Sequence, residues 1–209
     1  AVKAGAGSVM TSFNVVDYIP ATANKWLIDD VLRGEWNWNG FVVTDYGAIG
    51  EIIKHGLGNL DQASAMALKA GTHMDMYSEG FINTLAQSLK DGRVSMAEIN
   101  QACRRILEAK YKLGLFDNPY RFLDKKRHVQ DIYTPAHRQA AREIAAKSFV
   151  LLKNDNHLLP LKKQGKIALI GPMAHNRDNM AGTWAPTADN SKYATLKEAM
   201  QQALQGKAT

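Results

Sequence analysis

Asp45 is the residue of this sequence whose position most directly suggests chemistry. It ends the run Gly40-Phe-Val-Val-Thr-Asp45, and the loop Tyr46-Gly47-Ala48 follows it. The carboxyl end of a buried parallel strand is where open α/β sheets and barrels keep their sites. A carboxylate there has three common uses: a nucleophile toward a sugar carbon, a ligand for a metal ion or phosphate, or a cap for the next helix. The spacing alone leaves all three open.

Two further carboxylates, Asp75 and Glu79, follow the next expected strand. They could flank the same opening as Asp45, or cap the helix that comes after them. The histidines form no close pair with a carboxylate on one helical face, so their spacing favours structural roles over a metal site. These histidines are His55, His73, His128, His137, His157 and His175.

Two loops of the C-terminal third were candidates for ligand contact. Gly171-Pro-Met-Ala174 follows an expected strand, but it lacks the Gly-x-Gly-x-x-Gly spacing and Pro172 offers no backbone N–H, which excludes a dinucleotide site. Trp184 stands in a polar loop with no stripe to join. Its indole could stack on a sugar, a nucleobase or a neighbouring loop.

The elements that must position these residues alternate between strands and helices, which predicts a parallel sheet in an α/β fold. A helix is also expected from Ser95, whose spacing to Glu98 is that of a capping box. The apolar stripe of that helix includes Cys103 and predicts that this thiol lies in the core. The other expected elements are a strand at 8–13, a helix at 23–33, strands at 41–45 and 73–76, and a helix at 81–89.

Residues 114–135 break every periodicity and carry turn signals and charge, which favours a linker. Three strand–helix units are too few for an eightfold barrel, which takes about 250 residues. The pattern therefore predicts a piece of something larger, with a complete small α/β protein as the alternative. Beyond the linker, we expect a helix at 135–147, strands at 149–153 and 166–170, and a terminal helix from Leu196.

Composition excludes several classes of protein. Of 209 residues, 45% are hydrophobic and 22% charged, which excludes disordered and collagen-like chains. The net charge of +6 is spread along the chain, and its densest run, Lys125-Lys-Arg-His128, lies beside Asp124 and Asp131 without interleaved aromatics. This indicates a solvated face and no nucleic-acid partner.

The single cysteine excludes internal disulfides and thiolate zinc clusters. No apolar run reaches the roughly 18 to 20 residues of a membrane span, so no membrane partner is expected. The chain opens at Ala1 without a leader, so its residues do not indicate a compartment.

Four separate blocks, in the right order, resemble glycoside hydrolase family 3, and especially its two-domain bacterial β-glucosidases of the periplasmic type. The resemblance runs from Ala1 to about Leu204. The blocks are Gly40-Phe-Val-Val-Thr-Asp-Tyr46, Leu113-Gly-Leu-Phe-Asp-Asn-Pro-Tyr120, Ala146-Lys-Ser-Phe-Val-Leu-Leu-Lys-Asn154 and Leu158-Leu-Pro-Leu161.

The resemblance implies a three-part organisation. Residues 1–116 would be the C-terminal part of a TIM-like barrel, 117–134 a linker, and 135–209 the first part of an α/β sandwich domain. It further implies a retaining, exo-acting β-glycosidase that releases terminal β-D-glucosyl residues from small β-glycosides or oligosaccharides, needs no cofactor and resides in the periplasm.

The resemblance also assigns site residues. Asp45 matches the catalytic nucleophile, while the acid/base glutamate and the other sugar-holding residues would lie outside this chain. Tyr46 and Trp184 match places where some members sandwich the sugar in the leaving-group subsite, and Met10 matches the pocket floor, although simple core filling would also suit it. Phe13 stands where the family often has Tyr, and it cannot donate a hydrogen bond to Asp45.

Two rivals from other classes stay open at this point. One is a sugar-binding or interaction module that turns nothing over, and the other is a metal- or phosphate-dependent enzyme that uses Asp45 as a ligand. A truncated barrel would expose sheet edges, which favours a homo-oligomer or the remainder of the enzyme as a partner.

Overall fold

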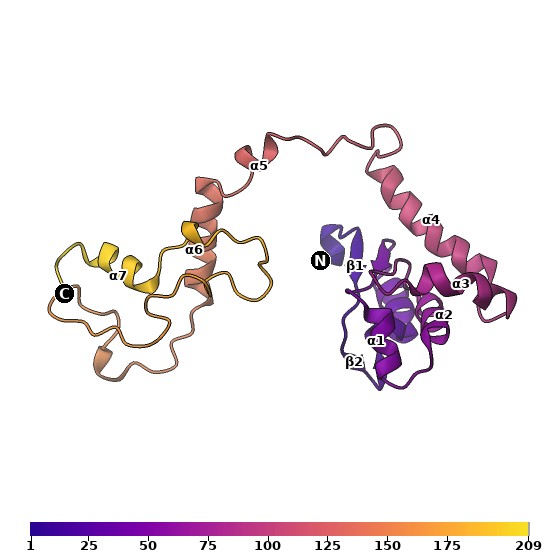
Figure 1. Ribbon diagram of the computed structural model, residues 1–209, viewed down its shortest axis with the longest axis horizontal. Helices are drawn as coiled ribbons and strands as arrows, with labels where there is room; N and C mark the ends of the chain where they lie inside the picture. Colours follow the sequence, from indigo (N-terminus) through magenta and orange to yellow (C-terminus); the bar gives the residue numbers. More distant parts are fainter. Residues whose placement is uncertain (209) are drawn as a thin grey trace. The chain divides into compact units, whose positions relative to one another are not determined.

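The computed structural model describes residues 1–208, and its contacts divide the chain into two compact units (Figure 1). Unit 1 is Ala1–His128, and unit 2 begins at Val129. The division falls inside residues 117–134, whose limits as a linker stay a prediction.

Unit 1 is built on a small parallel sheet. Strand β1 (Ser8–Met10) pairs in parallel with β4 (Phe41–Val43), and a single parallel bridge joins Val43 to Met74, which places β4 between the two. The predicted parallel pairing is confirmed. The strand expected at 73–76 is reduced to that bridge, because the chain turns into a loop directly after it.

A short hairpin that periodicity did not predict follows β1. Strands β2 (Val15–Val16) and β3 (Ile19–Pro20) are antiparallel, and Asp17 and Tyr18 form the turn with φ of 50° and 64°. Two positive φ angles are typical of a type I′ turn, whose twist matches that of the strands. The hairpin was not predicted because its turn contains no glycine and the apolar pattern does not indicate positive φ angles. The short helix η2 (Ala21–Ala23) follows.

The helix expected at 23–33 forms as a π-helix, η3 (Trp26–Glu35). Its hydrogen bonds span five residues, as from the Trp36 N–H to the Val31 carbonyl (3.0 Å). Apolar residues four apart predict a helix but do not separate this type from the α-helix. Its inner face joins a core cluster of Ile28, Leu32, Trp38, Val42 and Ala70.

A series of α-helices follows β4 in unit 1, and the predicted helices at 81–89 and from Ser95 are among them. The predicted capping box is present: the Ser95 hydroxyl accepts the Glu98 N–H (3.2 Å), and the Glu98 carboxylate accepts the Ser95 N–H (2.7 Å). The helices are α1 (Ala48–Lys54), α2 (Leu60–Ala70), α3 (Gly80–Lys90) and α4 (Met96–Lys112), after the N-terminal turn η1 (Val2–Ala4).

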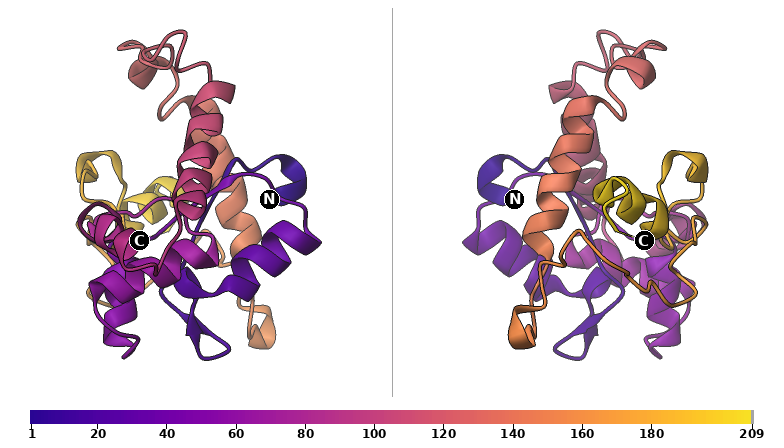
Figure 2. Two further views of the ribbon diagram at one scale, coloured as in Figure 1. Left: turned by 90° about the vertical axis from the view of Figure 1, so that its right-hand side faces the viewer. Right: turned by 90° about the vertical axis from the view of Figure 1, so that its left-hand side faces the viewer.

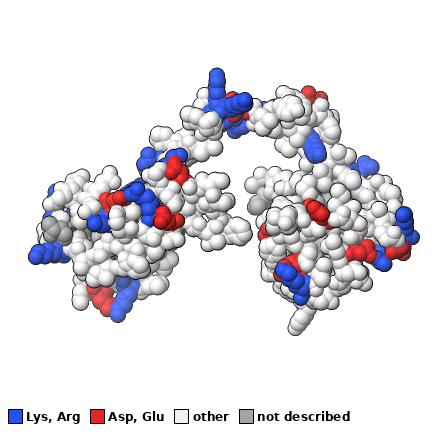
Figure 3. Space-filling model, viewed as in Figure 1, with Lys and Arg blue, Asp and Glu red and all other residues white. Residues whose placement is uncertain are grey.

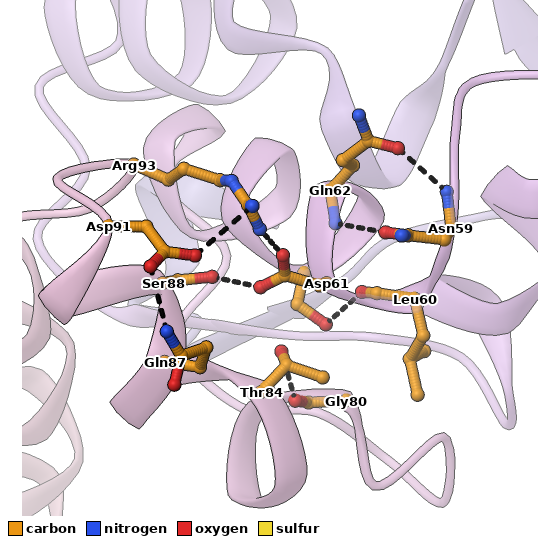
Figure 4. A network of polar contacts seen from close by, with 11 residues as sticks. Asn59, Leu60, Asp61, Gln62, Gly80, Thr84, Gln87, Ser88, Asp91 and Arg93 are labelled. Atoms are coloured by element: carbon orange, nitrogen blue, oxygen red, sulfur yellow. Dashed lines mark hydrogen bonds and ion pairs between the residues drawn. The ribbon is translucent and has the colours of Figure 1, made fainter.

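Polar contacts of Asp61 join α2, α3 and the turn that follows α3 (Figure 4). The carboxylate of Asp61, on α2, accepts a hydrogen bond from the Ser88 hydroxyl of α3 and forms an ion pair with Arg93. Arg93 also contacts Asp91 at 3.1 Å. The turn between α3 and α4 is thereby held against α2.

The prediction that Cys103 lies in the core is wrong. The side chain is exposed, and its neighbour Ala102 is the buried residue of α4. Consecutive residues of a helix point about 100° apart, so only one of the two can face the core. Ala102 does so with Val94, while Ile99 packs against the same cluster.

Unit 2 contains the two expected helices but neither expected strand. Residues 149–153 and 166–170 form no strand, and Figure 2 shows no strand arrow there. A strand exists only when a neighbour accepts its hydrogen bonds, and none of the described residues of unit 2 takes that place. The helices are α5 (Arg127–Gln130), α6 (Pro135–Ser148), η4 (Asp155–His157), η5 (Asn190–Lys192) and α7 (Leu196–Leu204), with α5 beginning at the end of unit 1.

Basic and acidic side chains are interspersed on the face drawn in Figure 3. Residues 125–128, the densest basic run, are exposed, as expected of a solvated face. Within residues 1–208, no helix is both long and apolar enough to cross a membrane.

Candidate active site

Asp45 lies just past the carboxyl end of β4 and is partly exposed. One carboxylate oxygen accepts the N–H of Tyr46 (2.6 Å), and the backbone carbonyl accepts the N–H of Ala48 (3.1 Å). The N-cap of α1 is Gly47, and no side chain caps that helix. The alternative in which the Asp45 carboxylate serves as the helix cap is therefore wrong, and the carboxylate remains available at the strand end.

Hydrogen bonds from the neighbouring loop hold this strand end in place. The side chain of Thr44 is fully buried, and its hydroxyl accepts the N–H of Met76 (2.8 Å). The Met76 carbonyl accepts the N–H of Gly47 (2.8 Å). Both sides of Asp45 are thus tied to one residue of the loop after Met74.

Asp75 has the capping role that Asp45 lacks. One of its carboxylate oxygens accepts the N–H groups of Gly80 (2.7 Å) and Phe81 (3.3 Å), the first two residues of α3. The other oxygen is buried and has no hydrogen-bond partner among the described residues. A carboxylate at a helix N-terminus also meets the positive end of the helix dipole. For Asp75, the cap alternative is confirmed.

Glu79 does not cap the helix that it precedes. It stands at the N-cap position of α3 with φ of 55° and no side-chain cap bond, and its exposed carboxylate accepts a hydrogen bond from the Asn83 amide (3.3 Å). Whether Glu79 flanks the same opening as Asp45 stays a prediction.

A second tyrosine joins Tyr46 beside Asp45. The rings of Tyr46 and Tyr77 are stacked, with centroids 4.0 Å apart and an angle of 17° between planes. The adjacent Tyr77 side chain is the main cause that raises the pKa of the Tyr46 hydroxyl. The sequence analysis did not predict a role for Tyr77. A signal was available, because Tyr77 is an aromatic residue in a loop and belongs to no apolar pattern of a helix or strand.

The other predicted binding residues are exposed aromatic or apolar side chains. Met10 lies in register with Val43, two residues before Asp45, and is 55% exposed. Phe13 is 44% exposed in the segment after β1. Trp184 belongs to unit 2, where its side chain is 96% exposed. Contact of these residues with a substrate stays a prediction.

His73 lies beside β4, one residue before Met74, which forms the bridge to Val43. Its Nδ1 accepts the Val42 N–H (2.9 Å), and its Nε2 is 3.3 Å from the Arg33 guanidinium. Burial, then the charges of Arg33 and Arg105, lower the pKa of His73 to about 4. A neutral, buried imidazole that bonds the backbone fits the structural role predicted for it. Within residues 1–208, no cluster of three or more His, Cys, Asp or Glu side chains is placed to hold a metal ion.

Fold and site together define an α/β protein with an available carboxylate at the carboxyl end of a parallel strand. Residues 1–109 match the glycosyl hydrolase family 3 N terminal domain, and residues 149–209 match the glycosyl hydrolase family 3 C-terminal domain. The chain belongs to glycosyl hydrolase family 3.

Relatives within this family are glycosidases. The periplasmic beta-glucosidase of Salmonella typhimurium is 42% identical over 208 residues, which cover 97% of this chain and 27% of that protein. The beta-xylosidase of Formosa agariphila is 39% identical over 193 residues, which cover 87% of this chain and 26% of that protein. The chain thus spans just over a quarter of the length of these relatives.

Solved structures show the same likeness in three dimensions. A beta-glucosidase from Listeria innocua in complex with glucose matches with a TM-score of 0.85 and 39% identity, over 100% of this chain and 28% of that one. A D270A mutant of the Listeria enzyme in complex with laminaribiose matches with a TM-score of 0.86 and 38% identity, over 100% of this chain and 29% of that one. The α/β fold class expected for this family is confirmed.

Proposed function

We propose that this chain acts within a longer, retaining and exo-acting β-glycosidase that releases terminal β-D-glucosyl residues from small β-glycosides. Family membership and the glycosidase names of the relatives support glycoside hydrolysis. The observation that carries the proposal is the carboxylate of Asp45, which is partly exposed at the strand end and is not used to cap α1.

In this mechanism, a carboxylate oxygen of Asp45 attacks the anomeric carbon while the bond from that carbon to the leaving-group oxygen breaks. The leaving oxygen takes a proton from a carboxylic acid, which the family resemblance places outside this chain. Water, deprotonated by the same group, then breaks the ester to Asp45 and releases the sugar. Because one of the two carboxyl groups is missing, we expect residues 1–209 alone to be inactive.

Tyr46, Trp184, Met10 and Phe13 are proposed to contact the substrate. Aromatic rings suit the apolar C–H faces of a pyranose, so Tyr46 and Trp184 are assigned to the leaving-group side. Glucose is proposed as the released sugar, in line with the names of the Salmonella and Listeria relatives. The name of the Salmonella protein likewise supports a periplasmic location.

The test is to trap the glycosyl-enzyme ester in the full-length protein with a 2-deoxy-2-fluoro β-glucoside that carries a good leaving group. We expect one label per enzyme, on the peptide that contains Asp45. Asp45→Asn should fold normally, take no label and lose nearly all activity on aryl β-glucosides, because an amide fills the same space but cannot form the ester.

Asp75→Asn and Glu79→Gln serve as matched controls and should still take the label. A label on Asp75 or Glu79 would overturn the assignment of Asp45. Faster labelling by the corresponding β-xyloside would move the proposed substrate from glucose to xylose.

A further inference from the structure

The backbone of Tyr77 is held in a conformation that is unusual for a tyrosine. Its φ is 76°, in the left-handed region that residues other than glycine rarely adopt. The preceding residue, Met76, donates to the hydroxyl of buried Thr44 and accepts from Gly47 (2.8 Å each). These two bonds, one on each side of Asp45, impose the direction in which Tyr77 leaves the sheet.

The stack of Tyr77 on Tyr46 is not part of the hydrophobic core. Tyr46 is 57% exposed and Tyr77 is 68% exposed, and neither ring joins a core cluster of unit 1. Two large rings in solvent gain little stability from burial. A strained backbone that serves an exposed ring pair next to an available carboxylate indicates a functional purpose.

We propose that Tyr77 is a positioning residue that selects the leaving group of the substrate. Its ring covers one face of Tyr46, so only the opposite face of Tyr46 can receive a flat group. That group is the aryl ring or the pyranose of the leaving group, bound beside Asp45. The proposal rests on the function proposed above and adds the residue that orients the leaving-group platform.

The test compares two substrates that share the glucosyl group but differ in the leaving group. An aryl β-glucoside has a ring that can stack on Tyr46, whereas β-glucosyl fluoride has none. In the full-length enzyme, Tyr77→Ala should lower kcat/KM for the aryl glucoside by about fivefold to tenfold and for the fluoride by less than about twofold. Tyr77→Phe keeps the stack and should recover most of the loss on the aryl glucoside.

Tyr18 offers a matched control, since it is also an exposed tyrosine at positive φ (93% exposed, 64°), in the hairpin turn. Tyr18→Ala should change kcat/KM for both substrates by less than about twofold. Equal losses on both substrates in Tyr77→Ala, or no loss on either, would overturn the role of Tyr77. A wild-type enzyme that cleaves neither substrate would instead refute the glycosidase proposal itself.

Discussion

Asp45 and Asp75 show how the same residue type acquires different uses at equivalent positions. Each follows a segment of the parallel sheet, but Asp75 accepts two N–H groups at the start of α3, whereas the side chain of Asp45 accepts, among residues 1–208, the N–H of Tyr46 alone. The N-cap of α1 is Gly47, which has no side chain to offer. The difference leaves the Asp45 carboxylate free of a capping role at the end of β4.

At the same scale, His73 should make the stability of unit 1 depend on pH. Its pKa of about 4 in the fold lies below the roughly 6.5 of an unfolded histidine, so the unfolded chain binds more protons between these values. Its contribution to the free energy of unfolding is therefore full above about pH 6.5. Of that contribution, about 3 kcal/mol is lost as the pH falls toward 4.

Urea unfolding of the wild type and of His73→Asn between pH 7 and pH 4.5 checks this. An asparagine can still accept the Val42 N–H but does not titrate, so the wild type should lose more stability than the variant on acidification. Parallel losses in the two proteins would refute the role assigned to His73.

At the scale of elements, the helices with clear local signals were predicted correctly, although the stripe of α4 placed Cys103 in the core wrongly. The box of Ser95 and Glu98 begins α4 as expected, and the helices at residues 81–89 and from Leu196 form. Their signals are local, because a cap and a stripe both act over three or four residues. The failed strands at 149–153 and 166–170 needed partners that the local pattern does not contain.

The cap of α4 should therefore have a measurable share in stability. Ser95→Ala removes the acceptor of the Glu98 N–H and one arm of the capping box. We expect a loss of about 1 kcal/mol in the free energy of unfolding. Chemical denaturation checks this, with the exposed Ser12→Ala, outside any helix, as the control. Equal effects of the two substitutions would show that the cap is not important.

At the scale of the whole molecule, the chain forms two compact units and has two exposed segments. The side chains of residues 117–132 are exposed, and the apolar run 149–152 is exposed too, although apolar runs of this kind are normally buried. Since the chain covers 27% of the Salmonella relative, we propose that segments of the longer protein cover this run.

Limited proteolysis of the full-length protein tests the predicted linker. Trypsin should cut first after Arg121, Lys125 or Lys126, which are exposed and lie outside long helices, and later after Lys112 at the end of α4. Mass spectrometry of the early fragments locates the cuts. First cuts within α2 or α3 would contradict the linker prediction.

The sequence by itself determined the alternation of strands and helices in unit 1, the cap of α4 and the carboxylate at the end of β4, because each depends on neighbours along the chain. Only the tertiary structure decided which carboxylate became a cap, that Tyr77 stacks on Tyr46, and that His73 is buried against Val42. The cap of Asp75 is a contact over five residues whose geometry the loop sets, whereas the ring stack and the Val42–His73 bond each join residues 31 apart in the sequence. Such contacts form when the sheet assembles, so the periodicity within one element cannot predict them.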